Sequence, residues 1–175
     1  MVFAFSLSFL APVLLAAMAV VAFRAPGRRP GRVPQWSEFV ALVAIALSLG
    51  GLGQVLISGP ARLGVGDGAA AFAFRADLFS LSMTLLVAFI GWIVMRYSRT
   101  YLDGEAREGA FHGLMLGTLA AVLIFVQAAS LWALLLATLG VGLGLKRLLQ
   151  NYPDRSAARR TATMIQLHRQ GGDNA

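Results

Sequence analysis

Four ionisable side chains stand inside or at the edges of long apolar runs, where they could carry protons or ions. They are Asp77, His112, Lys146 and Arg147. Ionisable groups at membrane depth are rare and usually face water or an opposite charge. We therefore take these four as candidates for a proton or ion path, or for polar contacts between helices. No catalytic, cofactor-binding or metal-binding set accompanies them, so enzymatic activity stays an open question and no cofactor is expected in this chain.

Asp77 stands immediately before an uncharged run that also carries Ser80, Ser82 and Thr84. These hydroxyls could line a hydrated proton path together with the carboxylate. A carboxylate just before the first turn of a helix also accepts hydrogen bonds from free backbone amides and meets the positive end of the helix dipole. We favour this capping role.

His112 stands near the start of the next apolar run. Imidazole titrates near neutral pH and could relay protons there. A lone histidine at a membrane interface is more often simply solvated, which is what we expect. His112 and His168 have no neighbouring cysteine or carboxylate at the spacing of a metal site.

Lys146 and Arg147 close the last apolar run, about 100° apart around a helix. We expect both to reach toward lipid headgroups. The alternative is that one faces the bundle and pairs with an acid on another helix. They are preceded by three glycines at alternate positions, Gly140, Gly142 and Gly144. Within a helix, we interpret these small residues as sites of close packing between helices and not as a nucleotide-binding loop.

The elements that position these groups must be transmembrane helices. Apolar residues make up 58% of the 175 residues and charged residues only 13%. A soluble domain of this size needs more polar surface than that. The net charge of +7 does not indicate nucleic acid, because the cations lie between apolar spans rather than on a folded polar domain.

We predict an all-α bundle of five transmembrane helices, because the run from 109 to 145 would reach about 55 Å as one helix and must fold back. The polar residues from Gln127 to Ser130 mark that turn, and the glycine-rich connector from 59 to 76 leaves room for a short extracytoplasmic hairpin. The first helix is expected to be retained rather than cleaved as a signal. The approximate limits are 3–23, 38–58, 77–97, 110–127 and 131–149.

The cations predict the orientation of this bundle. Of the 15 Lys and Arg residues, all but Arg62 and Arg75 fall on one side if the N-terminus is outside and the C-terminus cytoplasmic. Short loops rich in Lys and Arg stay in the cytoplasm. Residues 1–150 then form the transmembrane bundle, and residues 151–175 form a basic cytoplasmic tail that lies on anionic lipid or docks on a soluble partner.

The third apolar run and its flanks resemble a known family. The shared pattern is an Asp, a Leu-Ser-Leu-x-Met run, a Tyr-Ser-x-x-Tyr motif and a Gly-Glu turn. It is carried here by Asp77, Leu81 to Met83, Tyr97, Ser98, Tyr101, Gly104 and Glu105. This is similar to the third-helix region of the antiporter-like subunits of complex I (the NuoL or NADH dehydrogenase subunit 5 type) and of Mrp antiporters. The closer likeness is to DabB, the membrane subunit of an inorganic carbon transporter.

The resemblance implies a subunit of the bacterial inner membrane that works with partners. DabB-type subunits pair with a zinc-containing DabA protein resembling β-carbonic anhydrase and accumulate bicarbonate using a cation gradient. Complex I relatives carry a Trp-Glu pair in the fifth helix, and this chain has Thr138 and Leu139 at those positions. DabB-like proteins show a tryptophan and a histidine in the same helix, and this chain has Thr138 and Lys146 there. The later helices of the family are also missing, which predicts a truncated or split subunit that does not translocate ions alone.

Two alternatives remain beside inorganic carbon uptake. One is a fragment of a complex I or Mrp-type proton-translocating subunit, and the other is a small non-enzymatic scaffold protein of the membrane. Direct NADH oxidation has no support, because the sequence has no dinucleotide-binding motif and no cysteine for an iron–sulfur cluster.

Overall fold

The computed structural model describes residues 6–24, 31–65, 72–101 and 108–150. Five helices in it are long and apolar enough to cross a membrane, as the sequence predicts. They are α1 (Leu10–Arg24, preceded by the 3₁₀ turn η1, Leu7–Phe9), α2 (Val33–Ser58), α3 (Leu78–Tyr101), α4 (Glu108–Gln127) and α5 (Leu131–Gln150). The proposed cytoplasmic tail, 151–175, lies outside the described residues.

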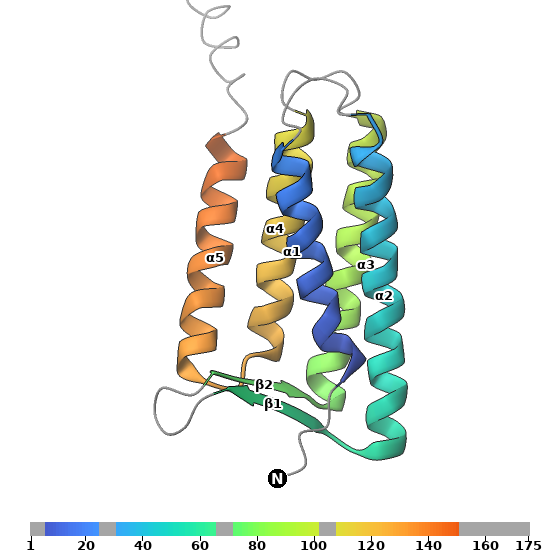
Figure 1. The fold of residues 1–175 in the computed structure, drawn as a ribbon, viewed down its shortest axis with the longest axis vertical. Helices are drawn as coiled ribbons and strands as arrows, with labels where there is room; N and C mark the ends of the chain where they lie inside the picture. Colours follow the sequence, from blue (N-terminus) through green and yellow to red (C-terminus); the bar gives the residue numbers. More distant parts are fainter. Residues whose placement is uncertain (1–5, 25–30, 66–71, 102–107, 151–175) are drawn as a thin grey trace, which may run out of the picture.

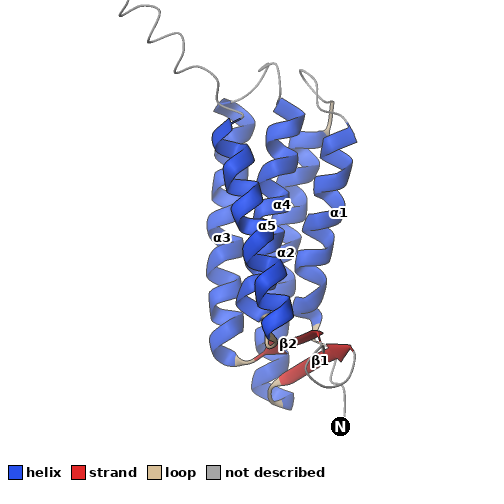
Figure 2. Ribbon diagram, turned by 90° about the vertical axis from the view of Figure 1, so that its left-hand side faces the viewer, coloured by secondary structure: helices blue, strands red, loops and turns tan. Residues whose placement is uncertain are grey.

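The helices stand side by side and alternate in direction (Figure 1). The helix α1 packs against α2 and α4, α3 packs against α2 and α4, and α5 packs mainly against α4. A view from the side shows all five axes running close to parallel (Figure 2). Because α5 packs mainly against one helix, only 11% of its span is buried within the chain, against 44% for α4.

The helices α2 and α3 extend several residues beyond their predicted limits, and α1 begins at Leu10, after the 3₁₀ turn, rather than near residue 3. The helix α2 begins at Val33 rather than near 38, because Pro34 occupies the first turn, where its missing N–H costs no hydrogen bond. The helix α3 continues to Tyr101 rather than ending near 97. Arg99 therefore projects from the same helix as Arg96 instead of from a connector.

The connector between α2 and α3 is an antiparallel hairpin of β1 (Ala61–Val65) and β2 (Phe72–Ala76). It lies across one end of the bundle, called here the hairpin end (Figure 1). The backbone of Ala73 bonds to the turn before α5, accepting from Ala129 N–H at 2.8 Å and donating to Ser130 Oγ at 3.1 Å. The predicted turn at Gln127–Ser130 is thus confirmed, and its backbone is tied to the hairpin.

The opposite end, called here the basic end, holds the described cations Arg24, Arg32, Arg96, Arg99, Lys146 and Arg147. Between the two ends the core is built from small and medium side chains, namely Ala11, Leu15, Ala19, Ala41, Ala44, Met95, Leu116, Ala120 and Leu123. Alanine at so many contacts lets the backbones approach closely, as is typical of helices packed in lipid.

Candidate functional site

The N-terminus of α3 at the hairpin end carries a reciprocal cap. The Ser80 N–H donates to Asp77 Oδ1 at 2.7 Å, and the Asp77 N–H donates to Ser80 Oγ at 3.1 Å. This is the geometry of a capping box, which satisfies two backbone amides at once. The capping role favoured from the sequence is therefore confirmed for Asp77.

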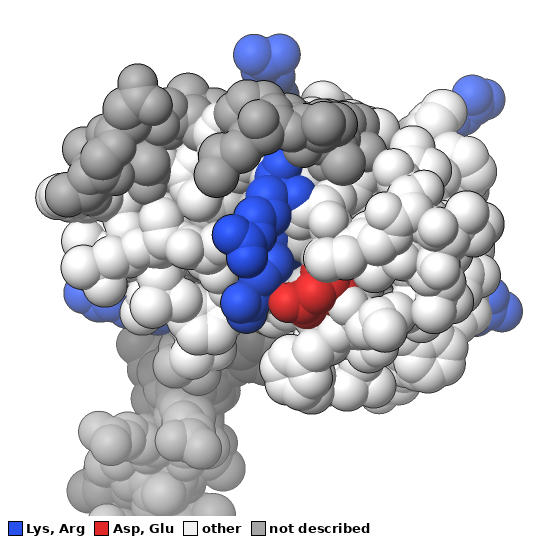
Figure 3. Space-filling model, turned by 90° about the horizontal axis from the view of Figure 1, so that it is seen from below, with Lys and Arg blue, Asp and Glu red and all other residues white. Residues whose placement is uncertain are grey.

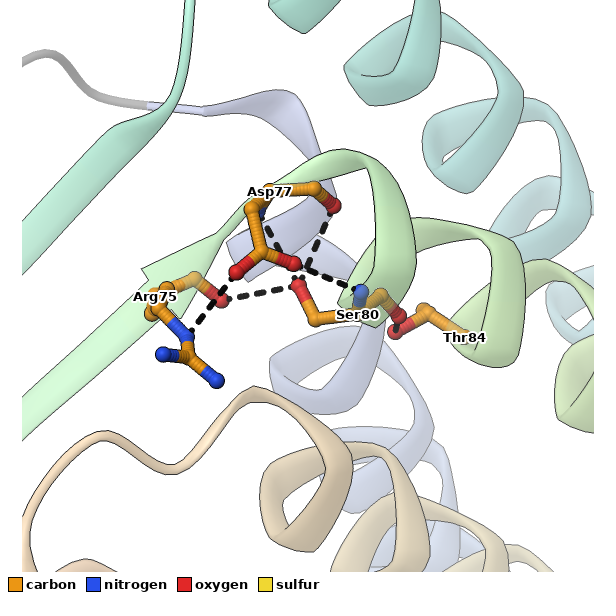
Figure 4. Close-up of polar contacts among 4 residues, drawn as sticks. All are labelled: Arg75, Asp77, Ser80 and Thr84. Carbon is orange, nitrogen blue, oxygen red and sulfur yellow. Dashed lines mark hydrogen bonds and ion pairs between the residues drawn. The ribbon is translucent and has the colours of Figure 1, made fainter.

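The same carboxylate also binds a neighbouring cation. Arg75 Nε lies 3.0 Å from Asp77 Oδ2, and the two side chains are 51% and 31% exposed. Asp77 thus links the hairpin to the first turn of α3. Ser80 adds a second link, because its Oγ donates a hydrogen bond to the Arg75 carbonyl at 3.2 Å (Figure 4).

Polar contacts continue from this cap into the apolar part of the bundle. Thr84 Oγ1 donates to the Ser80 carbonyl at 2.8 Å, one turn further along α3 (Figure 4). Gln127 Nε2, at the end of α4, lies 3.3 Å from Thr84 Oγ1. We call Asp77, Ser80, Thr84 and Gln127 the polar line. Ser82, the third hydroxyl-bearing residue predicted to line a path with Ser80 and Thr84, is exposed and bonds only its own helix.

Gln127 ends the polar line with an open acceptor. Its side chain is 1% exposed, and Oε1 has no hydrogen-bond partner among the described residues. The residue borders a cavity of about 300 Å³ whose other walls are apolar. The cavity is lined by Phe9, Pro12, Val13, Ala16, Leu63, Phe74, Ile124 and Gln127. A buried amide whose carbonyl oxygen has no hydrogen-bond donor destabilises the folded protein. Gln127 is therefore a better candidate for binding a polar ligand or ion than for stabilising the fold.

Sequence reasoning missed the pairing of Gln127 with Thr84. The signal available was weak, since Gln127 looked like the first residue of a turn and its partner lies 43 residues away. Only the packing of α3 on α4 brings them together.

His112 is not where we expected it. It is fully buried in α4, near the basic end, rather than solvated at an interface. Neither ring nitrogen has a hydrogen-bond partner within the described part of the chain, and the ring lies edge-on to Phe111 at 6.3 Å. The prediction of a solvated histidine is wrong because the face of α4 that carries His112 is covered by packing within the bundle, which sequence position alone does not reveal. It lies at the opposite end of α4 from Gln127, so it is not part of the polar line.

Lys146 and Arg147 are both exposed on α5. Neither forms an ion pair with any residue that the structure describes, and their extension toward headgroups stays a prediction. Two of the three glycines before them, Gly140 and Gly144, face Ala121 and Thr118 of α4, while Gly142 faces open space. The packing role predicted for these glycines is confirmed at the first two.

A second polar cluster lies at the basic end and was not predicted from the sequence. Glu38 of α2 binds Arg99 at 2.7 Å and Arg96 at 3.4 Å, both on α3. The Arg96 guanidinium also lies 5.7 Å from the centre of the Trp92 ring. The available signal was that Glu38 is the first acidic residue in the sequence and the only one before Asp67.

The hairpin end carries its own charged surface. Arg62 and Arg75 are directly opposite in the β1–β2 register, and both are exposed. Figure 3 looks onto this end and shows basic side chains gathered in the middle of the face beside an acidic one. Like charges opposite each other destabilise a hairpin, and here the Asp77 carboxylate offsets one of them.

The described residues contain no group of three His, Asp or Glu side chains placed to hold a metal ion. What the arrangement provides instead is a line of neutral hydrogen-bonding groups that begins at an ion pair on the surface and ends at a buried amide. Such a line can orient water or relay hydrogen bonds between α3 and α4.

The five apolar helices support a multi-pass membrane protein, and comparison with known proteins shows which proteins it is similar to. Residues 63–112 match the family described as NADH-ubiquinone oxidoreductase (complex I), chain 5 N-terminus. The match runs from the hairpin through α3 to His112, so it includes the cap and three of the four residues of the polar line. It supports an antiporter-like membrane subunit.

Individual relatives agree with this type. The chain is 34% identical over 128 residues to a probable inorganic carbon transporter subunit DabB2 of Halothiobacillus neapolitanus, covering 71% of this chain and 23% of the relative. It is 30% identical over 101 residues to NADH-ubiquinone oxidoreductase chain 5 of Mammuthus primigenius and of Elephas maximus, covering 58% of this chain and 17% of each relative. The resemblance inferred from the sequence motifs is confirmed, and the chain spans less than a quarter of the length of these relatives.

Proposed function

We propose that the chain supplies the N-terminal portion of an antiporter-like subunit in an inorganic carbon (bicarbonate or CO₂) uptake complex coupled to a cation gradient. The observation that carries this proposal is the similarity to the DabB2 subunit, which extends over 71% of the chain and is higher in identity than that to chain 5. The proposed complex is active only with its partner subunits, because alternating access needs a second structural unit around a site at the membrane midplane.

The proposed setting is the bacterial inner membrane, with the N-terminus outside and the C-terminus in the cytoplasm. The distribution of charge supports this orientation, since six of the described cations stand at the basic end, whereas the hairpin end has Arg62 and Arg75. The proposed partner is a DabA-like zinc-binding subunit, and the zinc would belong to that partner.

Within this proposal the polar line is the part of the chain that touches the transported proton or ion path. Its support is local: Asp77 is accessible at the hairpin end, and Gln127 presents a free carbonyl oxygen at the cavity. Lys146 and Arg147 contribute charge at the basic end. His112 is fully buried in α4 without a hydrogen-bond partner among the described residues, and it remains a candidate for the proton or ion path or for a polar contact between helices of this bundle.

A second function has a specific observation in its favour. The match to complex I chain 5 over residues 63–112 fits a fragment of a complex I or Mrp-type proton-translocating subunit equally well in that region. The two functions differ in what is transported, since one accumulates inorganic carbon and the other moves protons during NADH oxidation or cation exchange.

The test is uptake of radiolabelled bicarbonate by cells of the source organism that carry or lack the gene. Loss of accumulation on deletion, restored by the wild-type gene, supports the carbon-uptake proposal. Gln127→Leu should fail to restore it, while Ser82→Ala, which removes an exposed hydroxyl that bonds only its own helix, should restore it fully. Normal accumulation in the deletion strain contradicts the proposal, and a loss of NADH-driven proton pumping alone favours the second function.

A further inference from the structure

The basic end contains a charged pocket between α2 and α3 that the proposed transport function does not use. It is a cavity of about 410 Å³ lined by Glu38, Arg96, Arg99 and Thr100. The first of these comes from the second turn of α2 and the other three from the last two turns of α3, so the pocket lies at the ends of two membrane-spanning helices.

The pocket carries two positive charges and one negative charge. Glu38 is only 14% exposed and binds Arg99 closely, at 2.7 Å, whereas Arg96 is 66% exposed and more distant, at 3.4 Å. Each guanidinium has five N–H groups, and one contact with Glu38 leaves most of them free to bind an anion. The carboxylate therefore holds the arginines in place without neutralising them.

Aromatic rings place this pocket at the depth of lipid headgroups. Trp92 lies under Arg96, with the guanidinium carbon 5.7 Å from its ring centre. A neighbouring cavity of about 560 Å³ is lined by Arg32, Gln35, Trp36 and Phe39, and the last two rings meet edge to face at 6.0 Å. Tryptophan beside arginine at the end of an apolar helix is typical of the membrane interface.

We propose that this pocket binds the phosphate of an anionic phospholipid headgroup. Arg96 and Arg99 donate hydrogen bonds to the phosphate oxygens, Thr100 adds a hydroxyl donor, and the acyl chains extend along the apolar surface of α2 and α3 beside Trp92. Guanidinium forks match phosphate geometry, and basic pockets between transmembrane helices are suited to anionic headgroups.

The proposal is tested with the full 175-residue chain in phosphatidylcholine nanodiscs. Trp36→Phe and Trp132→Phe leave Trp92 as the only tryptophan, and brominated phosphatidylglycerol is titrated in as the quencher. Arg96→Gln/Arg99→Gln should raise the lipid concentration for half-quenching by roughly 25-fold, because each arginine loses a direct hydrogen bond to the phosphate that contributes about a factor of five.

The matched control is Arg24→Gln/Arg147→Gln, which removes the same charge at the same end but outside the pocket. It should change the half-quenching concentration by less than the pocket variant does; an equal change means general attraction to the interface and overturns the proposal. Arg96→Gln alone keeps the Glu38–Arg99 pair that links the helices, so it should stay folded and show about a fivefold effect. No effect from this variant also overturns the proposal.

The source of the phosphate is decided by competition. Inorganic phosphate and glycerol phosphate at millimolar concentration should leave the quenching by brominated phosphatidylglycerol unchanged, because neither has acyl chains to hold it at the helices. Displacement of the lipid by either soluble compound assigns the pocket to a free phosphate and refutes a lipid site.

Discussion

Removing the cap of α3 gives the most direct energetic test of the hairpin end. In Asp77→Ala, the Ser80 amide loses its acceptor at 2.7 Å and Arg75 loses its partner at 3.0 Å. The lost cap costs about 1 kcal/mol. Loss of a negative charge at a helix N-terminus adds about 0.5 kcal/mol. The ion pair adds about 0.5 kcal/mol, because both side chains are partly exposed.

The expected destabilisation of Asp77→Ala is therefore about 2 kcal/mol. Asp77→Asn should cost only about 1 kcal/mol, because asparagine caps as well as aspartate and only the charge is lost. Ser80→Ala should cost about 1 kcal/mol through the reciprocal bond to the Asp77 amide at 3.1 Å. The double variant Asp77→Ala/Ser80→Ala should cost less than the sum of the two, since each residue caps the other.

The assay is reversible unfolding in mixed detergent micelles, followed by circular dichroism and by tryptophan fluorescence. Ser82→Ala is the control, because this hydroxyl on the same helix is exposed and bonds only the Leu78 carbonyl. Equal losses for Asp77→Asn and Asp77→Ala would show that charge and not capping is the main effect. Additive losses in the double variant would refute the reciprocal bond.

Three further predictions concern other parts of the bundle. Gln127→Leu should leave the free energy of unfolding unchanged or raise it, because it removes a buried acceptor with no described partner and a long hydrogen bond; a loss above about 2 kcal/mol in the same micelle assay would contradict this. Gly144→Leu should separate α5 from α4, because a side chain at this position meets Thr118, and the separation would be measured as loss of a crosslink between the two helices. The control Gly142→Leu should be tolerated, because Gly142 faces open space. In the cysteine-free chain, Arg62→Cys and Arg147→Cys should react with an impermeant thiol reagent from opposite sides of the membrane, and labelling from one side would refute five spans.

Features set by neighbouring residues could be predicted from the sequence. The apolar runs predict five helices because a span of given length must be apolar throughout. The cap at Asp77 was predictable because donor and acceptor are three residues apart. The sequence predicts the hairpin only as a possibility, because it shows alternating residues in the connector. The pairing of Ala61–Val65 with Phe72–Ala76 depends on the separation of α2 and α3, which the sequence does not show.

Contacts between distant helices could not be predicted in the same way. Arg99 is 61 residues from Glu38, and Gln127 is 43 residues from Thr84, so both pairs depend on which faces of the helices meet. These helices are apolar on nearly all sides, which leaves little pattern to identify the inner face. The same uncertainty explains the error at His112, whose burial depends on how its face of α4 packs in the bundle.

The central claim, that the chain is a subunit of an inorganic carbon uptake complex, is tested most directly by purifying it with its partners. A tagged copy is expressed at its native level, solubilised from native membranes in mild detergent and analysed by mass spectrometry with zinc quantification. We expect a zinc-binding protein resembling β-carbonic anhydrase to co-purify in a fixed ratio with the chain. Recovery of neither that protein nor any antiporter-like subunit would contradict the claim.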